Sequence, residues 1–224
     1  MSLTVDLFQK HYDLREQEQA EVHYNDDIPY WFQRAIEEKD VDKLARSIVR
    51  SYQERNYQGL NEYLRGEKRI TSLYYEHNAE LLNRIIDELP SPPNTTLWRV
   101  EHFLEEKLKW AEKHIGKVLL VPSFWSTFSQ RDRCPVDPTF QIEASANTRA
   151  RMIADFTGFQ LGEAEALYKS GTLFRITAVD TCVYLEEVDN VKADIVAYNG
   201  YTISQDDEDH EDLGPLSLSD MGII

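Results

Sequence analysis

The chain of 224 residues is poor in cysteine, in long apolar runs and in positive charge. Its two cysteines, Cys134 and Cys182, form neither a disulfide framework nor the paired spacing of a metal site, and they suit a reducing compartment. No apolar run approaches the ~20 residues that a membrane-spanning helix needs. The chain has 24 basic and 40 acidic residues, which gives a net charge of −16. General binding to nucleic acid or anionic membranes needs clustered positive charge instead. We therefore expect no nucleic acid and no membrane among the partners.

The N-terminal segment MSLTVDLFQKHYDL has no basic stretch followed by an apolar core, so it does not resemble a secretory signal. We expect a protein that is cytoplasmic where it is made. Delivery into a target cell by a dedicated secretion system or a phage is compatible with this expectation. The hydrophobic fraction of 42% is enough for the core of one domain of moderate size, or of a smaller domain with an extension.

Apolar residues recur with helical spacing through the first ninety positions. Asp27 predicts one helix start, Asp40 can cap a second helix, and the strongest stripe predicts a third helix over 73–89. Residues 1–25 are mostly polar, and we expect them to be partly helical and peripheral. The motif Ser-Pro-Pro-Asn at 91–94 ends the helical region, because proline cannot continue a helix.

After residue 94 the pattern becomes mixed, and it favours short strands separated by turns. We predict an amphipathic helix over 103–114 that stops at Gly116, and strands over 95–100, 118–126 with a break at Pro122, 139–143, 164–168, 172–179 and 183–188. This order predicts an α+β fold with a mainly antiparallel sheet. The expected division is an N-terminal helical region (1–90), a core (91–203) and an acidic tail (204–224), which we expect to be disordered because it contains the run QDDEDHED.

The stretch GEAEALYKSGTLFRIT at 162–177 is the most informative part of the chain. Glu163 and Glu165 lie two positions apart at the start of a predicted strand, so both carboxylates should project to one face, while Ala164 and Ala166 point toward the packing side. Such a pair is weak evidence alone, because 40 acidic residues make it common. What strengthens it is the order of the motifs upstream.

Those motifs are an arginine among apolar residues, Arg99 in LWRV, and a serine–threonine after an aromatic, Ser126 and Thr127 in FWSTFS. Followed by GEAEALYKSGTLFRI, this order resembles the mono-ADP-ribosyltransferase family, in the branch with an R–S–E triad and an E-x-E motif. The resemblance covers about residues 95–188. It implies a split, two-sheet core with a cleft for NAD between the sheets. It also implies NAD as the substrate, no metal, and a target protein as the acceptor.

The resemblance assigns a role to each motif residue. Cleavage of the nicotinamide–ribose bond passes through an oxocarbenium-like transition state, which the Glu165 carboxylate would stabilise. Arg99 would bind the NAD phosphates or ribose through its planar guanidinium, and Ser126, with Thr127 beside it, would order the pocket. Glu163 would deprotonate the acceptor. An acid there, where relatives that modify other side chains carry glutamine, implies an arginine acceptor.

The sequence departs from the family pattern at two places. The usual Ser-Thr-Ser continues here with Phe128, and the next serine is displaced to Ser129. The aromatic residue that often precedes the E-x-E motif by three positions would fall on Gln160. Phe159 lies one position earlier, so we assign acceptor recognition to Phe159 and Glu163 in a loop of different shape.

Each residue also has an ordinary structural interpretation, and the function has two alternatives. Arg99 could pair with Glu101 or Glu106 on a surface, Ser126 could bond its own backbone, and the two glutamates could be edge-strand charges. An NAD glycohydrolase would use the same Glu165 with water as the acceptor. A catalytically inactive binding module would keep only the fold.

Overall fold

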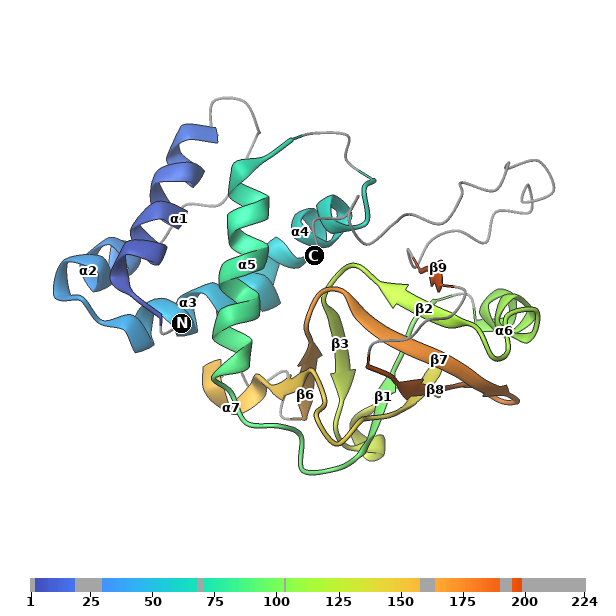
Figure 1. Cartoon of the computed structure of the whole chain (residues 1–224). Coiled ribbons are helices and arrows are strands. Elements are labelled where there is room, and N and C mark those ends of the chain that lie inside the picture. Colours follow the sequence, from blue (N-terminus) through green and yellow to red (C-terminus); the bar gives the residue numbers. More distant parts are fainter. Residues whose placement is uncertain are drawn as a thin grey trace. The chain divides into compact units, whose positions relative to one another are not determined.

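Helices fill the first part of the chain and strands predominate after it, as the α+β prediction requires (Figure 1). The computed structural model describes residues 3–18, 30–67, 71–102, 104–157, 164–189 and 195–198. These residues divide between two units. One, here called the helical unit, comprises the described residues within 1–92, 123–125 and 149–170, and the other, the sheet unit, comprises those within 93–122, 126–148 and 171–224. The boundaries predicted at residues 90 and 203 stay predictions, and the acidic tail lies outside the described residues.

The helices of the helical unit begin where the sequence supplies capping side chains. Asp40 caps the helix Val41–Ser51, because its side chain accepts a hydrogen bond from the Lys43 amide at 3.0 Å. Ser72 caps the helix Leu73–Asp87 and accepts a hydrogen bond from the Tyr75 amide at 3.1 Å. The elements are α1 (Val5–Glu18), α2 (Tyr30–Glu38), α3 (Val41–Ser51), a π-helical turn η1 (Tyr52–Asn56), α4 (Tyr57–Leu64), α5 (Leu73–Asp87), β5 (Ala150–Met152), α7 (Ala154–Thr157) and β6 (Glu165–Tyr168).

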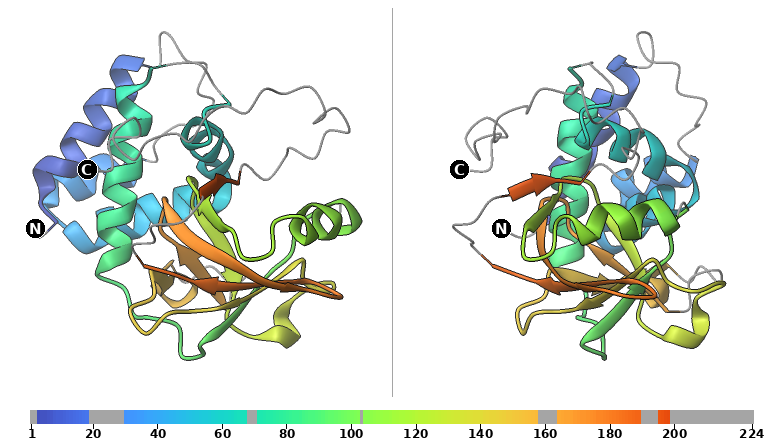
Figure 2. Two further views of the ribbon diagram at one scale, coloured as in Figure 1. Left: turned by 45° about the vertical axis from the view of Figure 1, so that its right-hand side comes forward. Right: turned by 90° about the vertical axis from the view of Figure 1, so that its right-hand side faces the viewer.

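One apolar core holds the helical unit together. Helix α5 contributes Leu82 and Ile86, which are fully buried, and α1 lies beside it (Figures 1 and 2). Phe8 of α1 is also fully buried in this core, so the expectation that residues 1–25 are peripheral is wrong for α1. The physical reason is the spacing of Phe8, His11 and Arg15, which puts these buried side chains on one helix face.

The strands of the sheet unit pair in the order β3-β1-β4-β8-β7-β2-β9. Only the pairs β4–β8 and β2–β9 are parallel among those described, so the predicted mainly antiparallel arrangement is confirmed. The elements are β1 (Thr96–Arg99), α6 (Leu104–Glu112), β2 (Val118–Val121), β3 (Trp125–Phe128, with Trp125 in the helical unit), a 3-10 turn η2 (Arg131–Arg133), β4 (Phe140–Glu143), β7 (Thr172–Val179), β8 (Val183–Glu187) and β9 (Ile195–Ala197).

Helix α6 packs on β7 and β8 (Figure 2) and ends as the sequence predicts. Gly116 has a φ of 85°, which a side chain would disfavour, and its amide donates to the Ile176 carbonyl of β7 at 2.8 Å. Pro122 separates β2 from β3, which is the predicted break. None of the helices in the described ranges has the length and apolar character needed to cross a lipid bilayer.

Candidate active site

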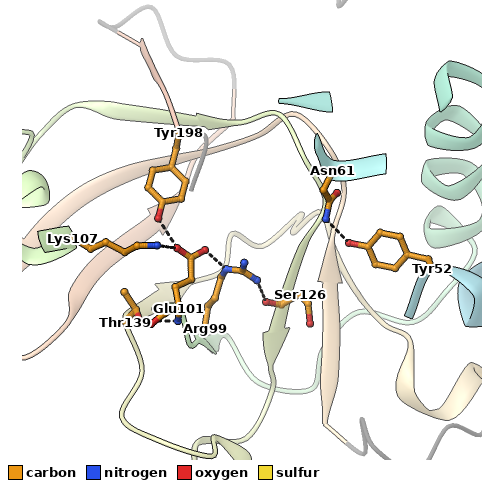
Figure 3. A network of polar contacts seen from close by, with 8 residues as sticks. All are labelled: Tyr52, Asn61, Arg99, Glu101, Lys107, Ser126, Thr139 and Tyr198. Carbon is orange, nitrogen blue, oxygen red and sulfur yellow. Dashed lines mark hydrogen bonds and ion pairs between the residues drawn. The ribbon is translucent and has the colours of Figure 1, made fainter. Parts of the chain in front are cut away.

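Arg99, at the end of β1, connects two neighbouring segments of the sheet unit (Figure 3). Its Nε donates to the Glu101 Oε1 at 2.6 Å, and its Nη1 donates to the backbone carbonyl of Ser126 on the adjacent strand β3 at 2.6 Å. The arginine side chain is 23% exposed. The structure therefore brings together Arg99 and Ser126, two of the predicted site residues. Their hydrogen bond attaches the guanidinium to the backbone of strand β3.

Glu101 is the centre of a buried polar network (Figure 3). Its side chain is 8% exposed, and its Oε2 accepts from the Lys107 ammonium of α6 and from the Tyr198 hydroxyl, the latter at 2.6 Å. Burial by itself raises the pKa of Glu101, but the charges of Arg99 and Lys107 outweigh it and lower the pKa to about 2. Glu101 is thus an ionised, buried partner that orients Arg99.

The same network explains two further observations. Burial and the Glu101 charge raise the pKa of Tyr198 well above its ordinary value, so its hydroxyl stays a donor. The pairing of Arg99 with Glu101, which the sequence left open as a surface contact, is present, but the carboxylate is buried. The sequence feature that indicates this pairing is the R-x-E spacing of Arg99 and Glu101, because residues two apart on an extended segment face the same side.

Strand β3 presents its residues alternately to two sides. Trp125 and Thr127 are buried, and Ser126 and Phe128 are only partly covered. Ser126 is therefore better placed than Thr127, which is 1% exposed, to meet a ligand. The displaced serine, Ser129, is also buried, and its Oγ has no hydrogen-bond partner among the residues that the structure describes.

Glu165 is the first residue of β6 in the helical unit. Its Oε2 accepts from the Gln53 Nε2 at 2.7 Å, and its backbone carbonyl accepts from the Ile153 amide at 3.1 Å. The flanking Ala164 and Ala166 are buried, as the strand alternation predicts. Gln53 was missed by the sequence analysis, because it precedes Glu165 by 112 positions and no local pattern connects them.

The two residues assigned to acceptor recognition, Phe159 and Glu163, lie outside the described residues. The roles predicted for the motif residues stay predictions. Within the described ranges, histidine, cysteine and carboxylate side chains form no group of three or more that could hold a metal ion.

Comparison with known proteins gives the wider context. The model of the ADP-ribosyltransferase exoenzyme family matches residues 31–201. Among curated proteins, none matches this sequence. Two structurally similar proteins illustrate the fold. The Vis toxin, an ADP-ribosyltransferase from Vibrio splendidus, gives a TM-score of 0.53 at 20% identity, over 88% of this chain and 92% of that one. The ATR domain of Salmonella SpvB gives a TM-score of 0.53 at 16% identity, over 65% of this chain and 98% of that one.

A third structure, Vis in complex with agmatine, gives a TM-score of 0.51 at 21% identity, over 90% of this chain and 94% of that one. At these identities the structural matches show the fold, whereas the family model spans most of the sequence. The family model confirms the resemblance to ADP-ribosyltransferases, and the assignment to the branch with an R–S–E triad and an E-x-E motif stays a prediction. The chain therefore belongs to the ADP-ribosyltransferase exoenzyme family, enzymes that transfer ADP-ribose from NAD.

Proposed function

We propose that this enzyme transfers ADP-ribose from NAD to arginine side chains of a target protein and releases nicotinamide. The observation that carries the proposal is the Glu163-Ala164-Glu165 motif, with the second carboxylate held at the start of β6 by a directed hydrogen bond. The complex of Vis with agmatine adds support, because agmatine carries the same guanidinium group as an arginine side chain.

Glu165 suits the role that we propose for it in the cleavage of NAD. Loss of nicotinamide leaves positive charge on the ribose, and a fixed carboxylate stabilises charge that develops only in the transition state. Gln53 holds one carboxylate oxygen through its amide nitrogen, and Ile153 holds the backbone of the same residue. The group therefore needs little reorganisation when the charge appears.

Arg99 and Ser126 suit the polar parts of the dinucleotide. A guanidinium presents its donors in a planar fork that matches phosphate oxygens, and the Arg99 side chain is 23% exposed. Its contact with the Ser126 carbonyl also fixes the backbone from which the serine hydroxyl projects. Thr127, buried on the opposite side of the strand, would support the NAD pocket through packing.

Glu163 and Phe159 complete the proposal on the acceptor side. A carboxylate can accept a proton from an arginine guanidinium as it attacks the ribose, whereas a glutamine amide cannot. Phe159 would contact the acceptor. The partner we propose is a target protein that carries an accessible arginine, in a cell into which this chain is delivered as a toxin-like effector.

The test measures nicotinamide release from NAD and ADP-ribose transfer to agmatine with the same purified protein. Glu165→Gln should lose both activities by at least about 100-fold, and Glu163→Gln should lose transfer while slow hydrolysis of NAD persists. Glu143→Gln, an exposed carboxylate on β4, is the matched control and should change neither.

The outcomes separate the proposal from its alternatives. Unchanged turnover in Glu163→Gln, with water as the acceptor in both proteins, would identify a glycohydrolase. No nicotinamide release by the wild type, even with a cell lysate that supplies acceptors, would refute the enzyme and leave a binding module.

A further inference from the structure

The helix from 41 to 64 changes its geometry at the π-helical turn η1. Here the Tyr57 amide donates to the Tyr52 carbonyl, five positions back, instead of four as in the flanking α3 and α4. Such turns are rare and occur frequently at functional sites. Gln53 is the second residue of this turn, so its side chain is presented by the irregular part of the helix.

Tertiary contacts fix the turn in this geometry. The Tyr52 ring meets the Phe124 ring edge-on, with the centroids 5.6 Å apart. The Tyr52 hydroxyl accepts from the Asn61 Nδ2 at 3.1 Å (Figure 3), and the Asn61 Oδ1 accepts from the Phe124 amide at 3.1 Å. Because all three residues are buried, the turn that carries Gln53 is fixed on both sides.

The amide of Gln53 has a defined orientation between two partners. The amide nitrogen faces Glu165 and donates to its Oε2 at 2.7 Å. The amide oxygen then faces Thr157, whose Oγ1 donates to it at 2.8 Å. The Thr157 hydroxyl thus holds the other end of the amide in the arrangement in which Gln53 donates to Glu165.

Further contacts hold helix α7, which carries Thr157. Arg46 of α3 donates from its Nη1 to the Phe156 carbonyl of α7, and its guanidinium lies 4.7 Å from the centre of the Phe156 ring. The Thr157 amide donates to the Ile153 carbonyl at 3.3 Å, and Ile153 in turn holds the Glu165 backbone. The side chain and the backbone of Glu165 are therefore positioned by one connected set of contacts.

We propose that Gln53 is a positioning residue for this enzyme, which holds the Glu165 carboxylate in the orientation that NAD cleavage requires. The inference rests on the proposed function of Glu165. A residue that orients a group acting in the transition state affects turnover more than the binding of substrate. The expected signature is a fall in kcat for nicotinamide release with little change in KM for NAD.

The experiment compares variants that change the hydrogen bonding or the charge at Gln53 and Thr157. Gln53→Met keeps the length of the side chain but not its donor, and kcat should fall roughly 10- to 100-fold. The kcat of Gln53→Glu should fall further, because this substitution places a second carboxylate beside that of Glu165. Thr157→Val should also lower kcat, and Thr157→Ser, which keeps the hydroxyl, should recover most of that loss.

Gln58→Met, an exposed position on α4, is the matched control and should match the wild type. Circular dichroism melting checks that each variant folds. If Gln53→Met does not fold, the Thr157→Val and Thr157→Ser pair decides, and equal kcat values in that pair overturn the inference.

The remaining outcomes are distinct. An active wild type with an equally active Gln53→Met overturns the inference alone. A raised KM at unchanged kcat overturns it too, since Gln53 would then contact NAD directly. No nicotinamide release by the wild type refutes the proposed function, and the positioning role with it.

Discussion

Replacing Glu101 by glutamine tests whether the buried network around Arg99 is stabilised by charge. The substitution keeps the shape of the side chain and removes the carboxylate that accepts from Arg99, Lys107 and Tyr198. The Lys107 side chain is 7% exposed, so its ammonium would face a neutral amide with little water to compensate. Removing one partner of such a pair costs more than the pair itself contributes, about 3–5 kcal/mol.

The pKa of Glu101 gives a second estimate of this stability contribution and the direction in which it changes with pH. A fall from 4.5 to about 2 corresponds to on the order of 3 kcal/mol of stability at neutral pH. Because the folded protein holds the pKa below its unfolded value, this contribution is fully present above pH 4.5 and is lost as the pH falls through about 2. The wild type and Glu101→Gln should therefore differ most at pH 7 and converge in acid.

Urea unfolding followed by tryptophan fluorescence, at pH values between 7 and 2, measures this difference. Glu143→Gln, the exposed control on β4, should stay within about 0.5 kcal/mol of the wild type at neutral pH. A difference for Glu101→Gln that is the same at pH 3 as at pH 7 would show that the hydrogen bonding of the amide, and not the charge of the carboxylate, sets the difference. A variant as stable as the control would refute the reasoning altogether.

Two further predictions concern the helical unit. Burial, with the charges of His77 and Arg15, lowers the pKa of His11 to about 3, so the wild type should lose stability below pH 6.5 by up to about 1.4 kcal/mol per pH unit. His11→Leu should flatten that slope in urea unfolding, and an unchanged slope would contradict the prediction. A Cβ at Gly59 would lie 2.5 Å from the Tyr75 hydroxyl oxygen. Gly59→Ala should therefore lower the free energy of unfolding by about 1–3 kcal/mol, with partial recovery in the double variant with Tyr75→Phe; equal values for both variants would argue against the clash.

Much of the fold could be predicted because its signals are local. The Asp40 cap, the helix end at Gly116 and the strand break at Pro122 each depend on the conformational preferences of one residue and its neighbours. The family, too, was indicated by short motifs around Arg99 and Glu165. Short elements without such signals, the strands β5 and β9 and the π-helical turn, were missed.

The sequence by itself thus determined the α+β class, most element positions and the family, since these follow from residue type and spacing. Only the tertiary structure decided which side chains meet the motif residues. Gln53 reaches Glu165 across 112 positions and Tyr198 reaches Glu101 across 97, because strand pairing and helix packing bring distant segments together. Hydrogen bonds of this kind depend on distances of a few ångströms in space, which spacing along the chain does not encode.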